Sequence, residues 1–261
     1  MASKKKEDGE TAAGAGNGTN GGNGGVSSTA GLVAARALLI GTTPIRIDPM
    51  DEEKILRITG KIDEEKPPTK CKLEELRAWL TERARKNLDA ACKADGQYGL
   101  PPRYLREALI SAGTGVKTGR MSKLSTATKS QVPSLIKIAD IFLSFPRSCQ
   151  TWALDIDHGH GQTGDFAAIF RARFDRWAIR PTLVFDPHRI PESTVRELVK
   201  LAGLNVGLGG HRPDRKGDGG MFEIGGWELL KEVPVLTGAV DVAALAAELK
   251  DEAEWTAPAA E

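Results

Sequence analysis

Residues 182–224 read TLVFDPHRIPESTVRELVKLAGLNVGLGGHRPDRKGDGGMFEI, and their pattern decides the fold. The apolar, β-branched segment 182–185 predicts a strand. A helix is expected after Pro191, because proline favours the first turn and apolar residues then recur at helical spacing. These apolar residues are Val195, Leu198, Val199 and Ala202. Two more extended segments are predicted after the helix, one from the alternation at 204–208 and one at 221–224.

The sequence before this segment predicts the strands that pair with it. Residues 138–145 and 151–157 each have the composition of a strand, and 166–177 alternates an apolar face with a polar one. The polar face carries Arg171, Arg173 and Asp175. Extended segments around a helix, with pairing strands on either side, are typical of a ferredoxin-like or split βαβ unit. We therefore predict an α+β fold, an antiparallel sheet with helices on one face.

The first half of the chain adds a strand that ends at Ile45–Ile47, an extended piece at 54–61 and two helices. The helices are expected over 73–93 and 103–112. This half supplies either a second α+β unit or a helical subdomain, and periodicity does not decide between them.

Composition divides the chain into four parts. We expect a disordered, glycine-rich tail at 1–30, a subdomain with a basic connector at 31–137, the ferredoxin-like unit at 138–237 and an acidic tail at 238–261. Apolar residues at helical spacing predict a short helix over 241–249 within that last part.

The overall composition excludes several classes of protein. The chain has 261 residues, with 36 Lys and Arg against 35 Asp and Glu, so it is not uniformly basic. It has no apolar run of about 18 residues and no apolar leader, so we expect neither a membrane partner nor export by that route. Its three cysteines form no C-x-x-C pair and suggest neither a disulfide framework nor structural zinc. A cytoplasmic protein fits these features.

The near-zero net charge hides a strong polarity along the chain. Residues 103–137 hold seven basic side chains and one acid, while 238–261 hold six acids and one lysine. Such an asymmetry can guide a polyanion to one face of a protein.

The segment between Gly203 and Gly226 contains nine glycines, far above the roughly 7% background. Basic residues lie at its centre. Glycine allows positive φ and close backbone approach, so this loop can present bare N–H groups while cations neutralise phosphate. A flexible hairpin tip without function has the same composition. No G-x-G-x-x-G sequence opens a helix here and no P-loop is present, which disfavours a dinucleotide or ATP site.

The predicted βαβ unit ends in a glycine-rich loop before a short strand, GLGGHR through GDGGMFEI, and this arrangement resembles the glycine-rich loop of the RAMP superfamily of CRISPR-associated RNA-binding proteins. The segment LPPRYLREALISA, residues 100–112, is similar to their proline-initiated helix. Both blocks also resemble uncharacterised phage and prophage proteins. The resemblance covers about a quarter of the chain. It implies a ferredoxin-like, RRM-related fold in a bacterial cell, with phage infection as one setting.

The resemblance implies that the chain binds single-stranded nucleic acid, RNA more than DNA, through its loop and a basic face. The basic face would consist of Arg103, Arg106, Lys117, Arg120 and Lys123. The loop clamp would consist of Gly207, Gly209, Gly210, His211, Arg212, Arg215 and Lys216. The chain lacks an RNP motif, and Trp152, Trp177 and Trp227 are interpreted as core or sheet-edge residues. We therefore expect backbone binding with little base readout and no cofactor.

Two other functions stay open. Metal-independent RAMP-like endoribonucleases use a histidine as general base, so His211, His158 and His160 are catalytic candidates. Asp155 and Asp157, at alternate positions of a strand, are metal candidates, although their spacing matches no established site. The residues favour a binding role over an enzymatic one without deciding the question. The third possibility is a self-assembling phage structural protein, a homo-oligomer or a subunit of a larger assembly.

Overall fold

The computed structural model describes residues 31–47, 71–118, 122–160 and 166–234. All of them belong to one compact unit, Gly31–Val240. The predicted tail at 1–30, the extended piece at 54–61 and the helix at 241–249 lie outside the described residues.

The main sheet is antiparallel and is built around β1 (Val33–Gly41). On one side β1 pairs with β13 (Phe222–Leu230), and on the other with β11 (Ala178–Ile179) and β12 (Thr182–Phe185). The outer strand next to β12 is β7 (Ile136–Ile138). Strands from both halves of the sequence thus share one sheet, and the predicted α+β class with an antiparallel sheet is confirmed.

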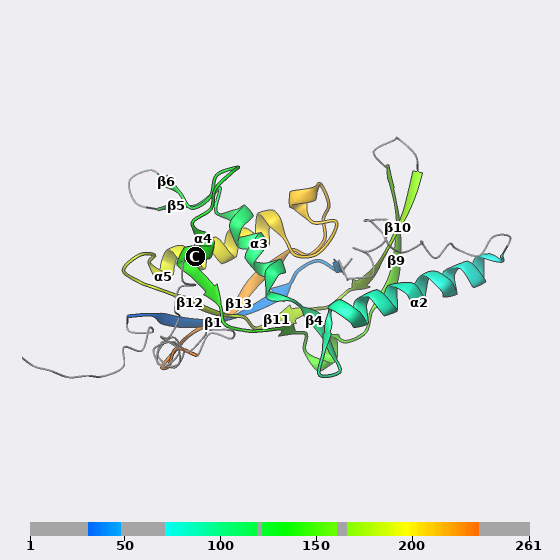
Figure 1. The fold of residues 1–261 in the computed structure, drawn as a ribbon, viewed down its shortest axis with the longest axis horizontal. Helices are drawn as coiled ribbons and strands as arrows, with labels where there is room; N and C mark the ends of the chain where they lie inside the picture. The colour runs from blue at the N-terminus through cyan, green and yellow to red at the C-terminus, as the bar shows by residue number, and fades with distance from the viewer. Residues whose placement is uncertain (1–30, 48–70, 119–121, 161–165, 235–261) are drawn as a thin grey trace, which may run out of the picture. The chain divides into compact units, whose positions relative to one another are not determined.

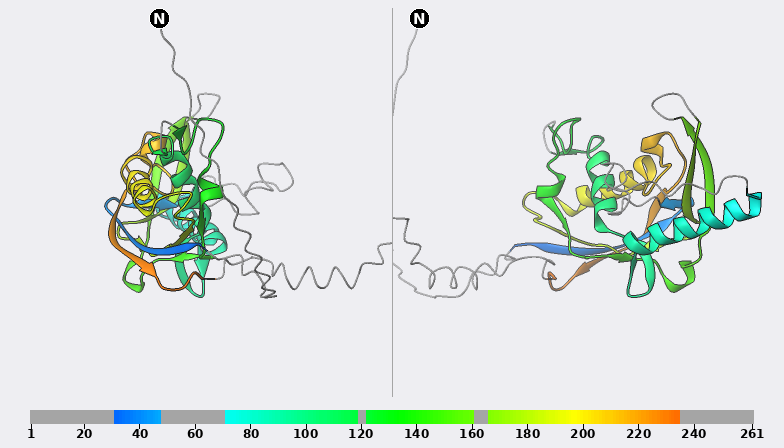
Figure 2. Two further views of the ribbon diagram at one scale, coloured as in Figure 1. Left: turned by 90° about the vertical axis from the view of Figure 1, so that its left-hand side faces the viewer. Right: turned by 45° about the vertical axis from the view of Figure 1, so that its right-hand side comes forward.

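Helices α3 (Pro102–Ala112) and α5 (Glu192–Leu201) lie on the same side of this sheet (Figures 1 and 2). Burial alternates along β1, which explains why the helices cover one face of the sheet. Ala35, Ala37 and Leu39 are fully buried toward the helices, while Arg36 and Ile40 are exposed. Each helix buries residues at three- and four-residue steps, as its sequence predicts. A four-residue helix, α4 (Val132–Leu135), precedes β7.

A second antiparallel sheet has the order β2–β10–β9. Its strands are β2 (Ile45–Ile47), β9 (Ala153–His160) and β10 (Phe166–Phe174), and Figure 1 shows β9 and β10 as a long two-stranded ribbon. The long helix α2 (Leu73–Ala91) packs against β9 and β10. The predicted alternation over 166–177 is confirmed in its described part, since Ala172 and Phe174 are buried and Arg173 is not.

Short elements complete the described part of the chain. A small sheet combines β3 (Lys93–Ala94), β4 (Gln97–Leu100) and β8 (Leu143–Ser144), and β5 (Lys117–Thr118) pairs with β6 (Ser122–Lys123). A 3-10 turn, η1, spans Arg147–Cys149. Within the described ranges no helix is long and apolar enough to span a membrane.

The predicted strand at 138–145 is wrong as a single element. Strand β7 ends at Ile138, and β8 begins only at Leu143. Asp140 lies between them and its carboxylate accepts the amide of Thr182 at 2.6 Å. A side chain thus takes the place of a backbone acceptor, and the strand ends there.

The extended segment predicted at 204–208 is also wrong. Ala202–Val206 continues α5 as a π-helical turn, η2, closed by the Gly207 amide donating to the Ala202 carbonyl at 2.8 Å. Gly203 allows this path, because a Cβ there would collide with the backbone carbonyl of Phe222. The alternation of Leu204, Val206 and Leu208 therefore reflects a wide helical turn followed by a loop.

Phe174 packs the end of β10 against the small β3–β4–β8 sheet within the core. Its ring is fully buried and makes edge contacts with Phe145 and Tyr98, with centroids 5.1 and 5.7 Å apart. We expect Phe174→Ala to lower the free energy of unfolding by about 3–5 kcal/mol, because the cavity cannot collapse in a packed interior. Urea denaturation measures the change. Ile141→Ala, at a side chain that is 73% exposed, is the control and should cost less than about 0.5 kcal/mol. Equal effects would contradict this account of the core.

Candidate nucleic-acid interface

The glycine loop, residues 207–220, connects η2 to β13 and is folded back on itself. Leu208 donates its amide to the Gly220 carbonyl, and Gly219 donates to the His211 carbonyl, each at 2.8 Å. Gly220 has φ +69°, and a Cβ there would collide with the carbonyl of Leu208. Only glycine meets both conditions. The loop therefore has a defined backbone and is not a loose hairpin tip.

The loop also lies on β2 through backbone hydrogen bonds. Gly210 donates to the Arg46 carbonyl at 2.7 Å and Gly220 donates to the Pro44 carbonyl at 2.8 Å. Gly209, at φ +77°, leaves no room for a side chain against Arg46. Many of the amides that the sequence suggested would be bare are thus used inside the protein. The loop's side chains, more than its amides, are available to a ligand.

Beneath the loop, β9 and β10 present a charged face. Asp155 accepts a hydrogen bond from Arg46 Nε at 2.7 Å and another from Arg173 Nη1 at 3.2 Å. The hydrogen bond from Arg173 to Asp175, together with the charges of both aspartates, raises the pKa of Arg173. Asp155 is 15% exposed, and each of its two oxygens is paired with one arginine. The described residues contain no group of three metal-binding side chains.

The glycine loop lies over β2, β9 and β10, and we call this contact the junction. His211 and Asp157, which the sequence suggested as separate candidates, meet there. Their closest atoms, Nδ1 and Oδ2, are 3.4 Å apart, and His211 Nε2 lies 3.9 Å from Asp218 Oδ1. His211 has φ +54°, a conformation that non-glycine residues seldom adopt. The side chains of the other candidates, His158 and His160, lie outside the described residues.

The outer side of the loop carries Arg215 and Lys216, both exposed, on the short 3-10 turn η3 (Pro213–Arg215) and just after it. The hydroxyl of Ser111, in the last turn of α3, contacts the Asp214 carboxylate at 3.3 Å. This contact places the loop beside the basic helix that the sequence singled out.

The other predicted basic residues lie on α3 and on the β5–β6 pair that follows it in the chain. Arg103 and Arg106 are exposed on α3, and Lys117 and Lys123 are exposed and directly opposite each other on β5 and β6. Strand β5 begins five residues after α3 ends. Arg120 lies outside the described residues.

Three arginines of the junction escaped the sequence analysis as site residues. Arg46 and Arg173 bind Asp155, and Arg171 lies against Gly210. The alternation over 166–177 placed Arg171 and Arg173 on a polar face, but only the folded chain brings the loop over that face.

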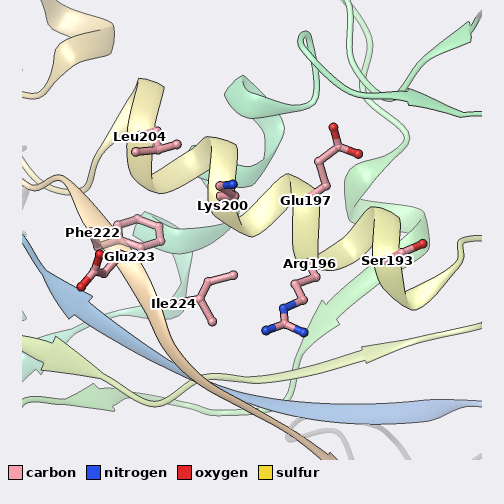
Figure 3. Close-up of a pocket in the computed structure, with 8 residues that line it drawn as sticks. All are labelled: Ser193, Arg196, Glu197, Lys200, Leu204, Phe222, Glu223 and Ile224. Carbon is pink, nitrogen blue, oxygen red and sulfur yellow. The ribbon is translucent and has the colours of Figure 1, made fainter.

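A separate groove of about 620 Å³ runs between α5 and β13 (Figure 3). Leu204, Phe222 and Ile224 line it, and α5 contributes Arg196 and Lys200. Trp227 donates its indole N–H to Glu192 at 2.8 Å, so it packs at the sheet edge as predicted. Trp177 is buried in the core.

No protein-family model matches the chain, and no curated protein matches it. Among solved structures, the chain is similar to one from the cryo-EM structure of the Type III-B Cmr-beta bound to cognate target RNA. The TM-score is 0.39 and the identity 11%, over 79% of this chain and 63% of that one. The chain thus spans less than two thirds of that protein's length. A likeness at this level establishes neither the family nor the function.

We expect Asp155→Asn to lower the free energy of unfolding by about 2 kcal/mol, because Arg46 and Arg173 lose the carboxylate that they share and keep only their exposed partners, Asp218 and Asp175. Thermal and urea unfolding measure the loss. Asp175→Asn, at a side chain that is 62% exposed, is the matched control and should cost less than about 1 kcal/mol. A stable Asp155→Asn variant would show that this ion-pair group does not hold the junction.

Proposed function

We propose that the protein binds the sugar-phosphate backbone of single-stranded nucleic acid, RNA in preference to DNA, on a ferredoxin-like core of RAMP type. The order of elements supports this core. Strands β1, β7, β12 and β13 occur in this order along the chain, with other elements inserted between β1 and β7 and between β7 and β12. Helix α3 is one of the elements between β1 and β7, and α5 lies between β12 and β13. In the sheet they lie in the order β13–β1–β12–β7, and this order supports a ferredoxin-like core. The glycine loop lies between the second helix of this set and its last strand, where the RAMP resemblance places it.

The observation that carries the proposal is the contact between Ser111 and Asp214. It brings the exposed cations of the loop, Arg215 and Lys216, beside the helix that carries Arg103 and Arg106. A nucleic-acid backbone carries negative phosphates spaced along a line, so it is bound by positive side chains spread over a surface and not by one deep pocket. Cations on two neighbouring elements meet this requirement.

The charges beneath the loop define which of its sides is available. Asp155 and Asp157 face the loop from β9 and pair with Arg46 and His211. These acids repel a polyanion, so most contacts of the proposed strand should lie on the outer side of the loop and the exposed side of α3.

The sheet face opposite the helices supports backbone binding over base readout. An RRM stacks bases on aromatic residues of its central strands. On this face β1 carries Arg36, Leu38 and Ile40, none of which is aromatic. Discrimination between base sequences should therefore be weak.

We expect the double variant Arg215→Gln/Lys216→Gln to bind a single-stranded RNA oligonucleotide about tenfold more weakly than the natural protein. The slope of log K against log salt should also be shallower, by the amount that corresponds to the loss of about one to two phosphate contacts. Fluorescence anisotropy between low and high salt measures both quantities.

The control for that experiment is Arg36→Gln/Arg180→Gln, which removes two exposed arginines from the opposite sheet face. It removes the same net charge and should keep most of the affinity. If both double variants lose affinity equally, binding depends on total charge and not on this surface. A salt-independent affinity would exclude phosphate binding altogether.

A second candidate function, metal-independent cleavage of RNA, is favoured by the approach of His211 to Asp157. A carboxylate next to one imidazole nitrogen orients the ring, so that the other nitrogen can accept a proton from a 2′-hydroxyl. In this geometry Asp157 would be the orienting group and His211 Nε2 the general base.

If the protein cleaves RNA, cleavage of an end-labelled oligonucleotide should persist in EDTA and fall at least a hundredfold in His211→Ala. Asp157→Asn should reduce it as well. RNA binding by both variants, measured in parallel, separates loss of catalysis from loss of substrate. Cleavage that continues unchanged in His211→Ala would show that this residue is not the base.

A further inference from the structure

We infer that Arg171 and Arg212 form a binding site for a phosphate-type oxyanion, beside the Gly209–Gly210 segment of the loop. The site would hold one phosphate group of the bound strand, and in that respect the inference rests on the proposed function. The binding of an oxyanion as such does not.

The evidence is a set of buried donors without partners. The Nε and Nη1 atoms of Arg171 and the Nε atom of Arg212 are buried and have no hydrogen-bond partner within the described part of the protein. A guanidinium keeps its charge at every physiological pH and offers five donors. Since buried polar groups are hydrogen-bonded in the great majority of cases, these three nitrogens call for an acceptor from outside the described chain.

The carboxylate next to Arg171 in the sheet, Asp155, already forms ion pairs with two other arginines. Arg171 lies opposite Asp155 in the β9–β10 register. However, Asp155 Oδ2 receives Arg46 and Asp155 Oδ1 receives Arg173. Arg171 thus has a carboxylate next to it in the sheet but forms no ion pair with it.

Both guanidinium groups lie against the same two-residue segment of the loop. Arg212 donates from Nη1 to the Gly209 carbonyl at 3.4 Å. A Cβ built on Gly210 would lie 3.4 Å from Arg171 Nε and 3.6 Å from Arg171 Cζ. Arg212 also donates from Nη2 to Asp214 Oδ2 at 3.5 Å, so its charge is partly balanced within the loop. An anion that binds both guanidinium groups would therefore supply the missing negative charge mainly at Arg171.

The chemistry favours phosphate over a carboxylate or a halide. A guanidinium binds phosphate through two parallel N–H···O bonds, and phosphate has enough oxygens to accept from a second arginine as well. Gly210 places no side chain over the Arg171 guanidinium, so only the loop backbone covers it.

The test is phosphate-dependent stability of the full-length protein. Thermal unfolding is followed in increasing sodium phosphate, with sodium chloride lowered to keep the ionic strength constant. The natural protein should gain several degrees in Tm, and Arg171→Met should lose that gain, with a phosphate Kd at least tenfold weaker. Sodium acetate at equal ionic strength should have little effect. Natural protein that does not respond to phosphate would overturn the inference.

The stability of the variants without phosphate separates a ligand site from a structural role. Arg171→Met in chloride should be as stable as the natural protein or more so, because it removes a buried charge that has no partner. A large loss of Tm in chloride with an unchanged phosphate response would instead show that Arg171 is structural and would overturn the site.

Gly210→Ala is the second variant. Its Cβ would make only ordinary contacts and its φ is not positive, so the fold should be kept while the methyl group partly covers Arg171. We expect its Tm in chloride to be unchanged and its phosphate affinity to fall at least threefold. The exposed Arg176→Met is the matched control and should respond to phosphate as the natural protein does. A full phosphate response in Gly210→Ala would contradict the site.

A single-stranded RNA oligonucleotide identifies the source of the phosphate. If RNA binds, Arg171→Met should lower its affinity and reduce the salt slope by about one contact. Unchanged RNA binding by Arg171→Met would overturn the assignment to the bound strand. If RNA does not bind the natural protein but phosphate still stabilises it, the proposed function fails and the oxyanion site stands as a site for free phosphate.

Discussion

The close approach of the glycine loop to β2 is the constraint on which the rest of the site depends. The amide of Gly210 reaches the carbonyl of Arg46, and the amide of Gly220 reaches that of Pro44. At Gly209 and Gly220 a side chain would stand where a neighbouring carbonyl already lies. The missing Cβ atoms therefore let one backbone lie on another, and this contact fixes the path of the loop from which its side chains project.

This arrangement divides the charges of the loop into two groups. On the inner side His211 faces Asp157, and Asp155 binds two arginines of β2 and β10. On the outer side Arg215 and Lys216 are exposed near the end of α3. The inner group holds the loop on the strands, and the outer group is free to act on a ligand. Arg171, opposite Asp155 in the sheet, is the exception on the inner side, because two of its buried donors have no acceptor within the described residues. The buried Nε of Arg212 is in the same state.

Much of the fold follows from local sequence, and the errors have local causes. The helix at 103–112 begins at a proline pair and buries Leu105 and Leu109, so period and capping agree. The strand predicted at 204–208 is wrong, because an alternation of apolar residues does not distinguish a strand from a π-helical turn that leads into a loop.

The junction itself could be foreseen only in part. The glycine and cation content of 203–226 predicted a special loop, but no local pattern places that loop on the polar face of β10. The pairing of His211 with Asp157 spans more than fifty residues and depends on the tertiary fold. Arg46 was not predicted as a site residue, because its sequence surroundings are those of an ordinary half-buried strand.

The central claim is that the outer side of the loop and the exposed side of α3 together hold a single strand. Hydrogen exchange of the full-length protein, with and without a single-stranded RNA oligonucleotide, tests this directly. The account predicts slower exchange in residues 103–112 and 207–220 and no change in 33–41 or 178–185. Protection confined to the groove between α5 and β13, or none anywhere, would contradict it.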